Sequence, residues 1–142
     1  MDFSIPEEIR RKLDELDAFI EREIAPLERE HIQFFDYRRE HARTDWEHGG
    51  RPRREWEELL REMRRRADAA GHLRYGLPKE LGGQGGSNLA MAIIREHLAA
   101  KGLGLHNDLQ NESSIVGNFP GVIMMARFGR PEQKAEFLEG MI

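Results

Sequence analysis

The chain has 142 residues, the size of one domain, with 34% charged residues, 39% apolar residues and a formal net charge of -4. This charge argues against a general attraction to nucleic acids or anionic membranes, and the absence of cysteine excludes disulfides, thiol catalysis and zinc–cysteine sites. No apolar run approaches the ~18 residues of a membrane span, and the N-terminus does not resemble a signal peptide, so we expect a cytoplasmic protein with no membrane span.

The first predicted helix begins at a capping box formed by Ser4 and Glu7, with Pro6 in the first turn. One apolar stripe then repeats every three or four residues, through Ile9, Leu13, Leu16, Phe19 or Ile20, and Ile24. Because Pro26 disfavours a helical conformation at Ala25, we expect the helix to kink or stop there.

Residues 31–51 have no clean period and mix aromatic with charged side chains. We interpret them as a long connection that is partly helical.

Four further helices are expected. The second follows Pro52 and ends at Gly71, with one face formed by Trp56, Leu59, Leu60, Met63, Ala67 and Ala70. The third is capped by Ser87, carries Leu89, Ile93, Ile94 and Leu98 on one side, and ends near Gly102. The fourth spans Ser113 to Val116, is interrupted at Gly117 and Pro120, and resumes from Val122 to Arg127; the last starts at Pro131. The predicted class is therefore all-α, an up-and-down-type helical bundle.

A glycine-rich stretch, GLPKELGGQGGS at residues 76–87, raises the possibility of a phosphate-binding loop. A P-loop requires lysine followed by Ser or Thr after its last glycine, whereas Gly86 precedes Ser87 and Asn88. A dinucleotide fingerprint has the pattern G-x-G-x-x-G after a strand. Gly83 and Gly85 match its first half, but position 88 is Asn88 and the loop follows a helix. We interpret the stretch as a connection between helices.

Two further patterns are weak. Glu28 and His31 form half of a di-iron carboxylate motif without a second copy, so no metal site is predicted. The histidines show no metal-ligand spacing; we expect His31, His41 and His48 to be exposed, and His72, His97 and His106 to be partly buried and hydrogen-bonded. Residues 51–66 hold seven arginines interleaved with four glutamates, which predicts ion pairs such as Glu58–Arg61 or Glu62–Arg66 rather than a nucleic-acid surface.

The order of these features resembles the N-terminal helical domain of the FAD-dependent acyl-CoA dehydrogenases. The most specific matches are LPKELGGQGGS (residues 77–87) and FGRPEQKAEFLEGMI (residues 128–142), and the likeness spans essentially the whole chain. Members of that family continue into a β-barrel domain and a C-terminal helical bundle. The resemblance therefore implies that residues 1–142 are one domain of a longer protein.

The resemblance implies a reaction in which an acyl-CoA thioester becomes the 2,3-enoyl-CoA, by α-proton abstraction and β-hydride transfer to FAD. In that family a glutamate of the C-terminal bundle is the base and the barrel holds most of the flavin, so no catalytic or cofactor-binding residue is assigned here. The isolated chain is expected to bind FAD weakly or not at all. The expected partners are an acyl-CoA substrate, an electron-transfer flavoprotein or similar acceptor, and further copies of the protein in a homo-oligomer.

The resemblance also implies that this domain forms one wall of the acyl pocket, at Ile115, Val116, Gly117, Phe119 and Pro120. The same residues fit an ordinary hydrophobic core equally well. Asn111, Ser114 or Asn118 either faces polar groups of a substrate or caps a helix. A second hypothesis is a non-catalytic module that binds a protein through Phe34, Phe35, Tyr37 and Trp46.

Overall fold

The computed structural model describes residues 4–107 and 114–142. The helices of this part are α1 (Glu7–Phe19), α2 (Ala25–Glu30), α3 (Arg39–Arg43), α4 (Arg54–Ala69), α5 (Asn88–Ala100), α6 (Pro120–Phe128) and α7 (Pro131–Met141). Strands β1 (Thr44–Asp45) and β2 (Arg51–Pro52) pair antiparallel. The largely helical structure confirms the predicted all-α class.

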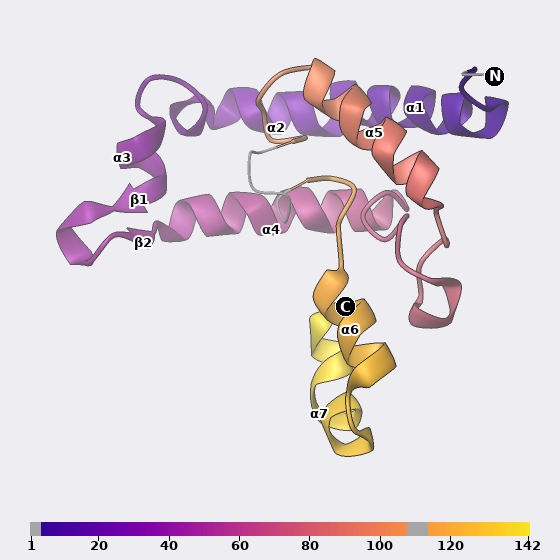
Figure 1. The fold of residues 1–142 in the computed structure, drawn as a ribbon. Coiled ribbons are helices and arrows are strands. Elements are labelled where there is room, and N and C mark those ends of the chain that lie inside the picture. Colours follow the sequence, from indigo (N-terminus) through magenta and orange to yellow (C-terminus); the bar gives the residue numbers. More distant parts are fainter. Residues whose placement is uncertain (1–3, 108–113) are drawn as a thin grey trace.

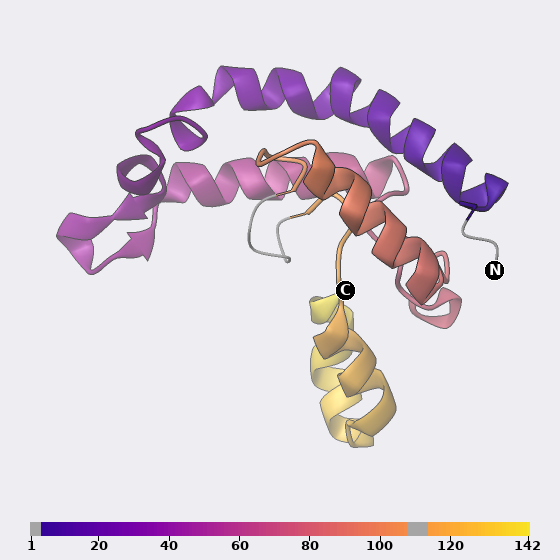
Figure 2. The same ribbon diagram turned by 45° about the horizontal axis from the view of Figure 1, so that its top comes forward.

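The helices lie in two groups (Figures 1 and 2). α1 and α2 form one long rod that runs beside α4 in the opposite direction, and α5 crosses this pair, making contact with α1. α6 and α7 form a hairpin that extends away from these helices in both views. The core therefore lies among α1, α2, α4 and α5, and the C-terminal hairpin is its projecting arm.

The predicted apolar stripe of the first long helix is confirmed, and that of the second is confirmed except that Leu60 is half-buried and Ala70 is exposed after the end of α4. Leu16, Ile24 and Met63 are completely buried, and Phe19 rather than Ile20 is the buried member of the pair considered for that position. The predicted face of α5 is partly wrong, since Leu89 is 58% exposed and Ala90 is buried. Residues four apart stack on one side of a helix, so Ala90 joins Ile94 and Leu98 on the core face and Leu89 turns outward.

The predicted capping box at Ser4 and Glu7 is wrong. α1 begins at Glu7 after Pro6, which is the N-cap residue and has no side chain that can cap the helix. Glu7 is thus the first helical residue instead of the third, which a capping box requires. The carbonyl of Pro6 instead accepts the N–H groups of Ile9 and Arg10, both at 3.0 Å.

The predicted irregularity before Pro26 is a π-helical turn at Ile20–Ile24. Ala25 donates its N–H to the carbonyl of Ile20, five residues earlier, and Pro26 then lies in the first turn of α2. Proline has no N–H to donate, and a first turn is where this loss costs least. The chain therefore passes the proline without leaving the helical path.

The connection at residues 31–51 is partly helical, as predicted, and it also contains the short β1–β2 ribbon, which was not predicted. It contains a 3₁₀ turn at Ile32–Phe34, then α3, and a second 3₁₀ turn at Trp46–His48 between the strands. Two-residue strands are too short to produce the alternation of apolar and polar residues that identifies a strand in a sequence.

The predicted fourth helix is wrong in its first part and confirmed in its second. Ser113 lies outside the described residues, and 114–119 are not helical: Ser114 pairs with Asn107 in an isolated β-bridge. The Gly117 N–H donates to the carbonyl of Leu73 at 2.8 Å, so the main chain of this segment bonds to another part of the chain instead of forming helical bonds. α6 then begins at Pro120 and α7 begins at Pro131, as its proline predicts.

Candidate functional site

The glycine-rich loop uses its backbone donors internally. The five consecutive N–H groups from Gly82 to Gly86 donate to carbonyl oxygens of residues 74–79, at 2.9 to 3.2 Å. Phosphate-binding loops point their N–H groups at the ligand. With its donors already engaged, the loop supports the interpretation that it is a connection between helices.

Two glycines of this loop are required by close packing. A Cβ atom on Gly83 would lie 1.9 Å from the carbonyl oxygen of Leu77, and one on Gly86 would lie 2.5 Å from the ring of Tyr75. Neither position has room for any side chain. The glycine content therefore follows from the fold of the loop.

The five residues predicted to form a pocket wall lie in three settings. Ile115 and Val116 are completely buried in the core, and Pro120 is exposed at the start of α6. Gly117 and Phe119 are buried and line a cavity of about 260 Å³ together with Asn88, Met91, Ala92 and Arg95 of α5, Gly76, Gly86, Asn118 and Ile123. The structure thus brings Gly117 and Phe119 to one hollow, whereas Ile115 and Val116 are buried in the core and do not line it.

The three candidate polar residues near this wall also separate. Asn111 lies outside the described residues. Ser114 is completely buried, its hydroxyl donates to the carbonyl of His106 at 3.3 Å, and its oxygen accepts the N–H of Val116 at 3.4 Å. Asn118 lines the cavity. Ser114 therefore holds the irregular segment in place. Of the two candidates that the structure describes, Asn118 borders the hollow.

Arg95 is the residue at this cavity that sequence analysis missed. Its Nη2 donates to the carbonyl of Val116 at 2.9 Å, which ties α5 to the segment that carries Gly117 and Phe119. The position is four residues after Met91, another lining residue, and this helical spacing was the available signal. The segment is held by the Gly117–Leu73 hydrogen bond, and nothing in the sequence indicates that this segment faces α5.

The family model described as Acyl-CoA dehydrogenase, N-terminal domain, matches residues 6–142. The chain belongs to the acyl-CoA dehydrogenase family. The resemblance stated from the sequence is thereby confirmed. Searches of curated proteins and of solved structures gave no match.

In this acyl-CoA dehydrogenase domain a buried polar pair connects two helical segments. α4 ends in a Schellman motif, in which the His72 N–H bonds to the carbonyl of Ala67 at 2.8 Å and Gly71 has a φ of 76°. This turn directs the His72 ring toward α1, where the Lys12 ammonium donates to its Nδ1 at 3.0 Å. Burial and then the Lys12 charge lower the pKa of His72 to about 4, so the imidazole is neutral at pH 7.

The other histidine predictions have mixed outcomes. His106 is buried, and His97 is half-buried with its Nε2 2.7 Å from Asp17, as expected. His41 and His48 are exposed as predicted, but His31 is half-buried. Its Nδ1 donates to the carbonyl of Leu27 at 2.9 Å.

The partial di-iron motif is used for packing. Glu28 accepts the N–H of Leu105 at 2.7 Å, while His31 bonds to the main chain of its own helix. Within residues 4–107 and 114–142, no group of three or more His, Asp or Glu side chains is placed to hold a metal ion. In the same residues no helix is both long enough and apolar enough to cross a membrane.

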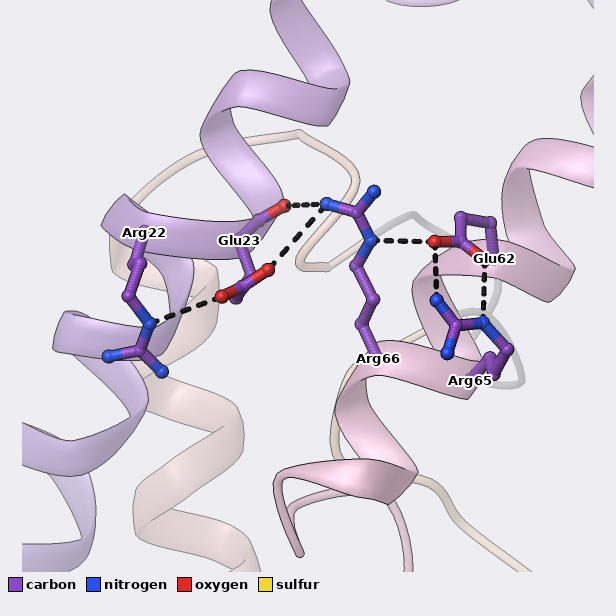
Figure 3. Close-up of polar contacts among 5 residues, drawn as sticks. All are labelled: Arg22, Glu23, Glu62, Arg65 and Arg66. Atoms are coloured by element: carbon purple, nitrogen blue, oxygen red, sulfur yellow. Dashed lines mark hydrogen bonds and ion pairs between the residues drawn. The ribbon is translucent and has the colours of Figure 1, made fainter.

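The arginine-rich part of α4 forms ion pairs (Figure 3). Arg65 and Arg66 each donate from Nε to Glu62 at 2.8 Å, and Arg66 Nη1 donates to the Glu23 carbonyl at 3.0 Å. The predicted Glu62–Arg66 pair is therefore confirmed, whereas Glu58 pairs with Arg54 at 2.6 Å. Hydrogen bonds from Arg65 and then Arg66 lower the pKa of Glu62 to about 2. These pairs connect α4 to the π-helical turn and interrupt any continuous basic face.

The aromatic residues proposed as a protein-binding surface do not form one. Phe34 is 3% exposed and packs 5.4 Å from the ring of Trp56, and Phe35 is half-buried against the same ring at 5.9 Å. Tyr37 and Trp46 remain exposed. Half of the hypothetical surface therefore belongs to the core of this acyl-CoA dehydrogenase domain.

Proposed function

We propose that this chain is the N-terminal domain of an enzyme that oxidises an acyl-CoA thioester to the 2,3-enoyl-CoA, and that it supplies one wall of the acyl pocket. The observation that carries the proposal is the family match over residues 6–142. It is supported by the cavity that Gly117 and Phe119 border. In this proposal the base that removes the α-proton and the electron acceptor lie outside residues 1–142.

Phe119 is the main wall residue in this proposal. Its ring packs closely on Gly117, where an added Cβ would be only 2.7 Å from it, and the side chain is buried at the edge of the cavity. A packed aromatic wall excludes water and contacts the acyl methylenes, each worth about 0.8 kcal/mol when buried. Exclusion of water protects a transferred hydride from side reactions.

FAD is the cofactor that the family generally uses, and it accepts the hydride. The glycine-rich loop does not fit its diphosphate, because the N–H groups of residues 82–86 are bonded within the loop. We therefore assign no flavin contact to this loop, and no step of the reaction to its residues. The contribution of the domain is to bind and orient the acyl group.

The test is acyl-CoA-dependent reduction of an artificial dye by the full-length protein, with a series of acyl chains. Phe119→Ala should enlarge the pocket and shift the preferred chain length, changing kcat/KM ratios by about tenfold, the equivalent of about 1.4 kcal/mol. Leu89→Ala, at an exposed site on α5, is the matched control. No dye reduction with any acyl-CoA would refute the enzymatic role, and an unchanged preference in Phe119→Ala would refute the wall.

A further inference from the structure

A second hollow, with a volume of about 340 Å³, lies beside α3. This volume is within the range of small-molecule sites, about 300–1,000 Å³. Its walls come from α3, from the chain just before and just after α3, and from the residues that follow α5. The lining side chains include Phe35, Arg39, Glu40, Arg43, Trp46 and Leu103. Most of the hollow thus lies on residues 31–51, to which the proposed function gives no role.

The apolar walls of this hollow are large and open to a ligand. Trp46 is 57% exposed and Leu103 is 56% exposed. The indole of Trp46 lies next to Gly50, 3.8 Å from where a Cβ of that residue would be, so the turn of the β ribbon supports it from one side. The half-buried ring of Phe35 forms a third apolar wall. A flat aromatic group in the hollow would remove these surfaces from water.

Arg43 fixes α3 at the edge of the hollow. Its Nε donates to the carbonyl of Phe34 at 2.7 Å, and its guanidinium lies 4.2 Å from the centre of the Trp56 ring and 5.3 Å from that of Phe35. Trp56 belongs to the hydrophobic core, so these contacts tie α3 to α4. A helix held in this way presents its other side chains with little further loss of conformational entropy when a ligand binds.

Arg39 is the cation that a ligand in the hollow can reach. It lies one turn before Arg43 on α3 and is exposed. Within the part of the chain that the structure describes, its side chain has no hydrogen bond or ion pair, whereas that of Arg38 is bonded to Asp36 at 2.6 Å. The two lining arginines outnumber the lining carboxylate, Glu40, so the hollow is cationic in a chain whose net charge is -4. This charge favours an anionic ligand.

We propose that this hollow binds a small aromatic carboxylate, with the ring against Trp46 and Leu103 and the carboxylate on Arg39. A carboxylate matches the planar fork of a guanidinium, and an aromatic ring packs well on an indole. The inference goes beyond the proposed function and does not depend on it, since this hollow shares no lining residue with the cavity that Gly117 and Phe119 border.

The test is an NMR titration of the chain with phenylacetate, followed at the indole N–H signals. The sequence has two tryptophans, and the Trp46→Phe variant identifies which signal belongs to Trp46. This signal should shift with a dissociation constant of about 3 mM, and that of the buried Trp56 should shift less.

Two control ligands separate the contributions of the ring and the charge. Phenylacetamide keeps the ring without the charge, acetate keeps the charge without the ring, and each should bind at least about tenfold more weakly than phenylacetate. Equal binding of phenylacetate and either control, or no shift of the Trp46 signal at about 30 mM phenylacetate, would overturn the proposal.

Matched variants separate the site from a general effect of charge. Arg39→Met should weaken phenylacetate binding at least about tenfold, and Leu103→Ala should weaken it about threefold. Arg51→Met removes the same charge from an exposed position of β2 outside the hollow and should bind as the original chain does. Equal loss in Arg51→Met, or full binding by Arg39→Met, would contradict the assignment. Thermal melts check that each variant folds; if Arg39→Met does not, the comparison of the three ligands on the original chain still decides.

Discussion

Lys12 and His72 are 60 positions apart in the sequence and share a hydrogen bond of 3.0 Å inside the protein. Because an ammonium group has no acceptor, His72 Nδ1 must be the acceptor, and the histidine must be neutral with its proton on Nε2. The pair joins α1 to the turn that follows α4. Protonation of His72 would place two cations at this distance.

Acid should therefore destabilise the chain through His72. The folded-state pKa of about 4 lies below the unfolded value of about 6.5, so the unfolded chain binds more protons between these pH values. The stability that neutral His72 contributes is fully present above about pH 6.5. As the pH falls toward 4, the free energy of unfolding decreases by up to about 3 kcal/mol. Urea unfolding across this range measures it.

The variant His72→Gln should flatten this part of the pH profile, and His41→Gln, at an exposed position, should leave it unchanged. A profile of the original chain that is flat from pH 6.5 to 4 would contradict the assignment of a neutral, buried His72.

Gly83→Ala should disrupt the helix connection. The added Cβ would lie 1.9 Å from the Leu77 carbonyl, and main-chain atoms cannot move aside as flexible side chains do. We expect a loss of at least about 3 kcal/mol in the free energy of unfolding. Gly140→Ala is the matched control in α7, where the Cβ meets nothing within 4 Å, and it should stabilise the chain by about 0.5–1 kcal/mol. Similar melting temperatures for the two variants would refute the packing argument.

The core face of α5 can be tested at two positions. Ile94 is completely buried, so Ile94→Ala should cost about 2–4 kcal/mol. Leu89 is 58% exposed, and Leu89→Ala should change the stability by less than about 0.5 kcal/mol. Chemical denaturation of both variants measures the difference, and equal losses would mean that the helix is rotated relative to the structure.

The hairpin of α6 and α7 should mediate self-association of the isolated chain. Met124 and Phe128 of α6 are 63% and 81% exposed, and Phe137 of α7 is 47% exposed. Apolar groups gathered on a projecting arm favour association. Sedimentation over a dilution series should show dimers or larger species, and Met124→Glu with Phe128→Glu should give monomers. Lys134→Glu on the same arm is the charge control; a monomer at every concentration would reject the prediction.

The sequence predicts the long helices well because their signals are local and repeated. The stripe of α1, the glycine that ends α4, and Ser87, whose Oγ accepts the Ala90 N–H at 3.1 Å, each act within a few residues. Ser4 misled the prediction because Pro6 took the N-cap position, and the choice between Leu89 and Ala90 depends on which side meets α1. The side of α5 that packs on α1 is set by tertiary contacts, and no local pattern of the sequence contains this information.

The site is less predictable for the same reason. Gly117 and Phe119 lie 11 and 9 positions before the first residue of the FGRPEQK motif, and the resemblance to a family drew attention to them. Arg95 reaches the same hollow only because Gly117 bonds to Leu73 and thereby brings the segment against α5. A contact between α5 and a non-helical segment has no period, so the pattern of the sequence does not reveal it.

The π-helical turn at Ile20–Ile24 changes the side of the rod formed by α1 and α2 on which the following side chains lie. Phe19 and Ile24 are both buried although five residues separate them, and five steps of about 100° in an α-helix would place them on different sides. A bond from residue 25 to residue 20 widens one turn by a single residue and returns Ile24 to the side of Phe19. The two halves of the rod therefore present one uninterrupted apolar edge, as if one residue had been inserted into a regular helix and absorbed at this turn.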